Sequence, residues 1–177
     1  MEQTMIVVDD EDNVLGFAPR SECHTGNGKR HRAFVLLVYN KNKEILLQHR
    51  KHSLFDNLWD LTGASHPLRV DGRNEGYEES ALHCLNREWG ISDVKLRNVG
   101  AFNYFKEYKD RCENEHCAII VGQYDGKFTA NPEEAYGFRW VGIEQLISEV
   151  KAKPDEFTAW AVEAIKLLKN SSFRQLL

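Results

Sequence analysis

The chain has 177 residues, of which 42% are hydrophobic and 28% are charged, and this predicts one globular domain over residues 1–177 with its core at about residues 5–170. The net charge of −4 lacks the basic excess typical of nucleic acid binding, and no apolar run approaches the roughly 20 residues that span a membrane. Four cysteines without a C-x-x-C pair, and an N-terminus without a long apolar stretch, predict a cytoplasmic protein with reduced thiols. A monomer is favoured.

Two hairpins are predicted in the first third of the chain. Residues 5–8 and 14–18 are apolar and flank the turn-like segment DDEDN, which predicts an N-terminal β-hairpin. Residues 21–30 are polar and irregular. The strongly apolar segment 34–39 is separated from the apolar segment 44–48 by the turn-like NKNK, which predicts a second hairpin.

Strands and helices follow one another in the remainder of the chain. Residues 54–76 are loop-like, with a short extended piece at 59–61, and helical spacing of apolar residues predicts a helix over 77–89 that Gly90 ends. Further strands are expected at 98–105, 116–123 and 137–141, further helices at 143–150 and 157–169, and a tail at 171–177. The sequence therefore predicts an α/β (α+β) fold, a mixed β-sheet sandwiched between helices with an N-terminal hairpin.

Three histidines and two glutamates are candidate metal ligands. His24 and His31 lie seven residues apart, His66 follows in TGASHPL, and Glu113 and Glu115 are two residues apart in CENEHC. On a strand, two residues at that spacing project from one face, where like carboxylates repel unless a cation or a shared proton relieves them. Imidazole and carboxylate together suit zinc, manganese, iron or magnesium. Taken singly, each residue is more often solvated than ligating, so the spacing alone is a weak signal.

The motifs around these residues resemble a known family. VDDEDNVLGFAPRSECH, HRAFVLLVYNKNKEILLQHR, WDLTGASHPL, NREWGI and ENE occur in the same order and at similar spacing as in the type 1 isopentenyl diphosphate isomerases of the Nudix superfamily. The similarity runs from about Met5 to beyond Trp160. It implies a Nudix-like fold and a metal-dependent enzyme that interconverts isopentenyl and dimethylallyl diphosphate, a small-molecule substrate, by proton transfer.

The resemblance also implies roles for individual residues. His24, His31, His66, Glu113 and Glu115 would form a site for Mn²⁺, Zn²⁺ or Mg²⁺. A separate residue, Glu88, would hold a Mg²⁺ ion against the substrate diphosphate. The catalytic pair on one side of the alkene would be Glu115, which exchanges a proton, and Tyr104, which orients it.

Four more positions would contact the substrate. Trp160 would line the alkene pocket, where an aromatic face stabilises a cationic intermediate. Arg20 and Arg50 would bind the diphosphate. The family has a lysine in the loop after Arg50 that lacks a clear counterpart here, and Lys51 or His52 would replace it.

Ala64 is the main departure from the family pattern. The isomerases place a catalytic cysteine at this position, and a methyl group cannot exchange protons. Cys117 would share the face of Glu115 rather than oppose it, and Cys84 stands where the isomerases carry a phosphate-binding arginine. Isomerisation is therefore expected to be slow or to use a different acid.

Two other functions stay open at this point. Nudix hydrolases use metal-bound water to attack a diphosphate, but the predicted helix offers only Glu88 of the three carboxylates in their motif, with Glu78, Glu79 and Glu134 in reserve. The third function is a non-catalytic protein that binds a metal or an allylic diphosphate.

Overall fold

The structure is a computed structural model that describes residues 2–168. The predicted tail at 171–177 and the end of the predicted core at residue 170 lie outside this range. Within it, nine strands form one mixed sheet with the order β11-β4-β3-β1-β2; β10 and β6 also pair with β3, β9 pairs with β10, and β5 pairs with β4. The strands are β1 (Thr4–Val8), β2 (Val14–Pro19), β3 (His31–Tyr39), β4 (Glu44–Arg50), β5 (Trp59–Asp60), β6 (Gly63–Ser65), β9 (Leu96–Tyr108), β10 (Arg111–Gln123) and β11 (Ala135–Gly142).

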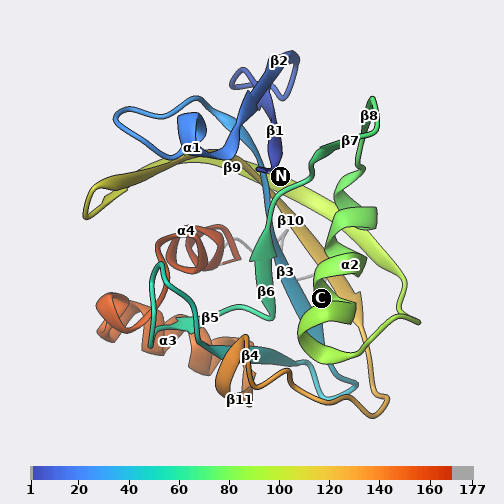
Figure 1. Cartoon of the computed structure of the whole chain (residues 1–177). Helices are drawn as coiled ribbons and strands as arrows, with labels where there is room; N and C mark the ends of the chain where they lie inside the picture. Colours follow the sequence, from blue (N-terminus) through green and yellow to red (C-terminus); the bar gives the residue numbers. More distant parts are fainter. Residues whose placement is uncertain (1, 169–177) are drawn as a thin grey trace.

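Helices cover both faces of this sheet (Figure 1). They are α1 (Arg20–Cys23), α2 (Tyr77–Trp89), α3 (Ile143–Ala152) and α4 (Ala159–Leu168), with a 3₁₀ turn at Pro154–Glu156 and a small hairpin of β7 (Arg69–Val70) and β8 (Arg73–Asn74). The predicted mixed sheet between helices, with the N-terminal hairpin β1–β2, is therefore confirmed. No helix within residues 2–168 is long and apolar enough to cross a membrane.

The most apolar stretch of the sequence forms the centre of the sheet. Val35 and Leu37 of β3 face the core beneath α3 and α4, whereas Phe34, Leu36 and Val38 face the core beneath α2. A strand that is buried on both faces reads as a continuous apolar run, which is why this segment was recognisable. Its parallel neighbour β10 extends alongside it from Glu115 to Gln123.

Helix α2 has the bounds that the sequence predicts. Ala81, Leu85 and Trp89 are buried on its inner face, and the side chain of Glu79 accepts a hydrogen bond from the backbone of Gly76 at 3.2 Å, which secures the first turn. Gly90 ends the helix in the left-handed region with a φ of 66°, a conformation that glycine adopts without strain. The helix is thereby fixed at both ends against the sheet.

The predicted second hairpin is wrong beyond its turn. Strands β3 and β4 pair only at Tyr39 and Ile45 and then diverge, because the chain between β5 and β6 inserts between them. The hydroxyl of Thr62 donates to the carbonyl of Leu46 at 2.8 Å and accepts from the backbone N–H of Val38 at 2.8 Å. The buried side chain of Thr62 therefore bridges β3 and β4 beyond the point where they pair with each other.

Other differences from the predicted elements are local. The irregular segment 21–30 begins with the end of α1, and the loop-like segment 54–76 contains β5, β6, β7 and β8. The last helix begins at Ala159 rather than at residue 157, because the backbone N–H of Thr158 instead donates to the carbonyl of Trp59 at 3.0 Å. These short elements depend on tertiary pairing, which local sequence does not reveal.

Replacing Thr62 with valine should destabilise the fold. The substitution keeps the shape of the side chain but leaves the N–H of Val38 and the carbonyl of Leu46 buried without their partner, at a cost of about 2–3 kcal/mol. Chemical unfolding followed by circular dichroism measures this loss. Thr129→Val, at an exposed threonine, is the matched control and should change stability by less than about 0.5 kcal/mol; equal effects in the two variants would contradict the bridging role.

Candidate metal centre and adjoining cavity

The five residues predicted as metal ligands come together in space. One ligand atom from each of His24, His31, His66, Glu113 and Glu115 lies within 4.8 Å of all the others. His24 follows α1, His31 begins β3, His66 follows β6, and the glutamates lie on β10. The parallel register of β10 with β3 sets Glu115 beside His31. The pairing of these central strands therefore brings His31 together with the two glutamates of β10.

Two of the imidazoles turn unprotonated nitrogens into the cluster. Nδ1 of His24 lies 2.8 Å from the carbonyl of Arg20, and Nδ1 of His31 lies 2.8 Å from the carbonyl of Lys29. A carbonyl only accepts, so each Nδ1 carries a proton, and in the neutral form of the ring the Nε2 then presents a lone pair. These Nε2 atoms, together with Oε2 of Glu113, are buried and have no hydrogen-bond partner among residues 2–168.

The unpartnered atoms face one another. Nε2 of His24 lies 3.2 Å from Oε2 of Glu113, and Nε2 of His31 lies 3.7 Å from Oε1 of Glu115. Acceptors at such distances repel one another, and burial makes an unsatisfied polar group costly. Burial also holds the pKa of His31 well below its usual 6.5, so its imidazole is neutral, the form that binds metals. A divalent cation fits this donor set.

His66 is held differently from the other two histidines. Nη1 of Arg20 lies 3.1 Å from Nδ1 of His66, and because a guanidinium only donates, this Nδ1 accepts. Nε2 of His66 therefore carries a proton and donates it to Oε1 of Glu115 at 2.8 Å. Ligation of a metal by this Nε2 would require the proton to move to Nδ1 and the side chain of Arg20 to turn away.

Glu115 also receives a short hydrogen bond from Tyr104. The phenol donates to Oε2 of Glu115 at 2.5 Å, and both side chains are buried. Burial raises the pKa of Glu115 above its usual value, against the opposing effect of the Tyr104 hydrogen bond, and burial likewise raises the pKa of Tyr104. A carboxyl group with a raised pKa, oriented by a neutral phenol, is suited to give and take a proton.

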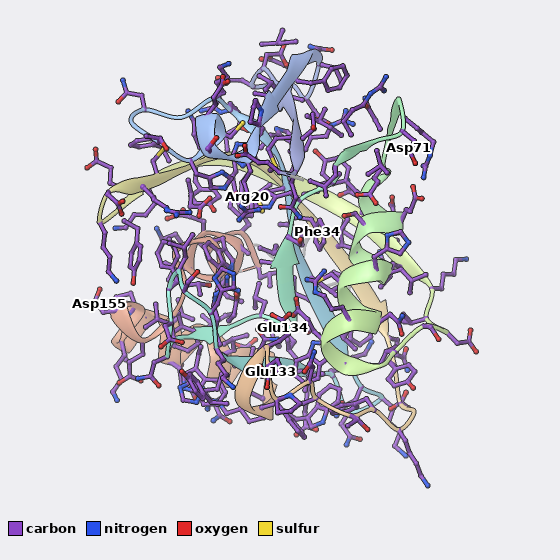
Figure 2. All side chains as sticks on the ribbon, in the orientation of Figure 1. Arg20, Phe34, Asp71, Glu133, Glu134 and Asp155 are labelled. Atoms are coloured by element: carbon purple, nitrogen blue, oxygen red, sulfur yellow. The ribbon has the colours of Figure 1, made fainter. Side chains whose placement is uncertain are left out.

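A cavity of about 510 Å³ adjoins the cluster. Its lining includes Glu115, Trp160 and Arg50, and Ala64 lies on its wall. Figure 2 labels Arg20 beneath α1 and Glu134 near β4, on opposite sides of Phe34 in this view, and both also line the cavity. The cavity therefore extends from the cluster of histidines toward the end of α2.

Glu88 is the carboxylate of α2 that lines this cavity. Its Oε2 accepts from Nε2 of Gln48 at 2.9 Å, and its Oε1 accepts from Nη2 of Arg87 at 2.7 Å. Gly63 makes room for it, since a Cβ at that position would lie 3.2 Å from Oε2 of Glu88. Glu134 lines the cavity as well, but Glu78 and Glu79 do not: Glu78 accepts from the backbone of Asn98, and Glu79 pairs with Arg73.

Not every predicted substrate-binding residue reaches the cavity. Arg20, Arg50 and Trp160 line it, as does His52, but Lys51 does not. The Nζ of Lys51 instead donates to the carbonyl of Pro132 at 2.8 Å. Of the two candidates for the missing lysine, only His52 is brought to the cavity, because the chain after β4 turns Lys51 toward the segment before β11.

Asp60 is a functional candidate that the sequence prediction missed. Its Oδ1 accepts from Nε1 of Trp160 at 2.7 Å and from the hydroxyl of Thr158 at 3.0 Å, and its Oδ2 lies 3.5 Å from Nη1 of Arg50. The guanidinium of Arg50 also lies over the ring of Trp160, 5.2 Å from its centroid. The buried carboxylate of Asp60 thus fixes Trp160 and Arg50 in the cavity wall. Trp160 lies far from both Asp60 and Arg50 in the sequence and meets them only in the folded chain, so no local motif reveals this arrangement.

Comparisons with known proteins identify the family to which the chain belongs. Residues 29–161 match the NUDIX domain family. The structure resembles that of DR0079 from Deinococcus radiodurans (TM-score 0.72, 17% identity, 93% of this chain and 98% of that one) and that of a MutT protein from Methanosarcina mazei (TM-score 0.61, 17% identity, 77% and 91%). The chain therefore belongs to the Nudix family and has the fold of these proteins.

Relatives at higher identity narrow the family. The chain is 38% identical to an isopentenyl-diphosphate Delta-isomerase of Haloarcula marismortui over 81% of this chain and 79% of that protein. It is 32% identical to a protein of the same name from Serratia proteamaculans over 94% of this chain and 91% of that protein. The chain belongs to the isopentenyl-diphosphate Delta-isomerase family within the Nudix proteins, and the predicted resemblance is confirmed.

Mn²⁺ or Zn²⁺ should bind at one equivalent and raise the melting temperature. At a free metal concentration near 100 times the dissociation constant, the expected rise is about 5–10 °C, because the cation relieves the repulsion among buried acceptors. Calorimetry and metal analysis measure binding. His31→Ala should lose the bound ion and the rise.

His116→Ala is the matched control for this metal experiment. His116 lies next to Glu115 on β10 but is hydrogen-bonded to Asn103 at 2.9 Å and lies outside the cluster. Its substitution should leave one ion bound. Undiminished metal binding by His31→Ala would show that the cluster is not the metal site.

Asp60→Asn should gain stability relative to the wild type as the pH rises. Burial raises the pKa of Asp60 from 3.8 to about 6, so the folded state binds a proton between these pH values that the unfolded state has released. The stability that Asp60 contributes is then fully present below pH 3.8 and is lost as the pH rises through 6. The total loss in the free energy of unfolding is about 3 kcal/mol. Unfolding free energies of both proteins at pH 4 and pH 7 measure the difference, and a difference that does not vary with pH would contradict the account.

Proposed function

We propose that this protein interconverts isopentenyl and dimethylallyl diphosphate by proton transfer. The relatives that share most of its length carry the name of that isomerase. The single observation that carries the proposal is the arrangement of Glu115, which belongs to the metal-binding cluster, lines the cavity and accepts a hydrogen bond from Tyr104. One carboxyl group thereby joins the metal centre to the space where a substrate would lie.

The reaction requires one proton to be added to the alkene and another to be removed two carbons away. The carboxyl group of Glu115 exchanges the proton on its side, with the phenol of Tyr104 holding its Oε2 at 2.5 Å. The ring of Trp160, which already accepts the guanidinium of Arg50 on its face, stabilises the cationic intermediate. The low exposure of these groups keeps water from capturing that cation.

The diphosphate is bound at the other end of the cavity. Arg50 supplies positive charge there, and Glu88 is the residue that would hold Mg²⁺ against the phosphates. Bound Mg²⁺ would neutralise the phosphate charge, which is costly to bury unpaired. The five-residue cluster would hold the second ion, for which we propose Mn²⁺, Zn²⁺ or Mg²⁺.

The wall opposite Glu115 carries no acid at position 64. Ala64 lies on β6, which pairs with β3 on the side away from β10, and its methyl group exchanges no proton. Among residues 2–168, Cys117 is the only cysteine that lines the cavity. It extends from β10 on the same face as Glu115. Proton exchange on the Ala64 side is therefore the slow step, and we propose a slow isomerase.

Diphosphate hydrolysis is the competing function. Nudix hydrolysis relies on several helical carboxylates around its metal ions, and Glu88 is the only carboxylate of α2 that lines the cavity. The contacts of Glu78 and Glu79 hold them outside it. The site therefore favours proton transfer over hydrolysis.

Incubation with isopentenyl diphosphate, Mg²⁺ and Mn²⁺ in D₂O tests the proposal. Deuterium should enter the recovered prenyl diphosphates, as measured by mass spectrometry. Release of phosphate or pyrophosphate without deuterium would instead identify a hydrolase. Neither product, with metal bound, would leave only a binding function and would overturn the proposed isomerisation.

Ala64→Cys should accelerate deuterium incorporation by tenfold or more, because general acid catalysis typically contributes about 10²–10⁴-fold. Ser65→Cys is the matched control, since Ser65 also lines the cavity and is the next residue of the same strand. It should leave the rate unchanged. No gain in a folded, metal-loaded Ala64→Cys protein would count against the assignment of the missing acid to position 64.

A further inference from the structure

We propose that Arg87 is a substrate-binding residue that contacts the anionic diphosphate beside Glu88. Its side chain is 49% exposed, lies at the end of α2 and lines the same cavity as Arg50 and Glu88. This proposal rests on the proposed function only in taking a diphosphate as the ligand. The sequence did not single out Arg87, since an arginine in the last turn of a helix is commonly explained by the helix dipole.

Arg87 acts as the counter-cation of Glu88 in the substrate-free protein. Its Nη2 donates to Oε1 of Glu88 at 2.7 Å and lies 3.6 Å from Sγ of Cys84. Because Gln48 occupies Oε2, we take Oε1, which the guanidinium covers, as the oxygen through which Glu88 would bind a cation. Two positive charges cannot share that oxygen without repulsion, so Arg87 leaves it when a divalent cation binds.

Glu88 keeps its place when Arg87 leaves. Its other oxygen, Oε2, is held by Nε2 of Gln48 at 2.9 Å, from β4, so the carboxylate does not depend on Arg87 for its orientation. A divalent cation can thus replace the guanidinium at Oε1 while Gln48 and β4 stay in place. The long, half-exposed side chain of Arg87 moves away, whereas the buried thiol of Cys84, which also donates to Oε1 at 3.2 Å, stays in place.

Two anions are then available to the released guanidinium. One is Glu134, labelled in Figure 2, whose Oε1 lies 3.7 Å from Nε of Arg87. That pair is partly solvent-exposed, and such pairs contribute little. A diphosphate in the cavity carries more charge and offers paired oxygens that match the two donors of a guanidinium. The diphosphate is therefore the stronger partner, and the metal and Arg87 bind it from neighbouring positions.

Calorimetric titration with pyrophosphate in the presence of Mg²⁺ tests the role of Arg87. We expect Arg87→Gln to weaken binding by tenfold or more, as the loss of a charge-assisted hydrogen bond implies, and Arg87→Lys to give an intermediate loss. Arg73→Gln is the matched control, because Arg73 also pairs with a glutamate of α2, Glu79, but lies outside the cavity. It should bind pyrophosphate like the wild type, and the melting temperatures of all variants verify folding.

Each alternative result overturns the proposal. Unchanged pyrophosphate binding by Arg87→Gln, with tighter Mg²⁺ binding, would show that Arg87 only neutralises Glu88. No binding of pyrophosphate by the wild type would show that this end of the cavity is not an anion site. The readout does not depend on turnover: an Arg87-dependent pyrophosphate site without deuterium exchange would contradict the isomerase function alone, whereas exchange with an unchanged KM in Arg87→Gln would contradict this proposal alone.

Discussion

The mutual repulsion of buried acceptors dominates this structure. The lone pairs of two imidazoles and the oxygens of two glutamates converge within 4.8 Å in a region where solvent cannot screen them. Among residues 2–168, five buried side-chain nitrogen or oxygen atoms have no hydrogen-bond partner, and three of them belong to this cluster; the other two are Oδ2 of Asp60 and Nε of Arg139. The hydroxyl of Thr62, by contrast, is paired with both strands that it bridges. A cation bound at the cluster would relieve its unpaired atoms and would act on the neighbouring cavity through Glu115, which lines it.

Much of the fold was predictable because its strongest signals are local. Residues 34–39 of β3 form a continuous apolar run since both faces of the strand are buried there, and α2 has the bounds that its periodicity and Gly90 predict. The failures are all cases in which distant segments determine the pairing. No property of residues 34–48 reveals that Thr62 separates the two strands, and β5 and β6 exist only because they pair with β4 and β3.

The site divides in the same way between predictable and unpredictable parts. The five residues of the cluster were predicted from their order and the family resemblance, and the strand register sets Glu115 beside His31. Asp60 and Arg87 were missed because neither belongs to a motif, and each is significant only for what folding places beside it. For Asp60 this is the indole of Trp160, and for Arg87 it is the carboxylate of Glu88.

The contrast between Arg87 and Ala64 shows which functions can move within a fold. A phosphate is a large anion that a long guanidinium can reach from several positions, so Arg87 can supply positive charge although the nearby position 84 holds a cysteine. A proton, however, must be delivered to one carbon from one direction, and the residue that faces Glu115 across the cavity is fixed by the pairing of β6 with β3. Cys117 is on the wrong strand for this task, and Cys84 packs in the core beneath α2. On the functions that we propose, binding persists by substitution at a distance, whereas the rate of proton transfer depends on position 64 itself.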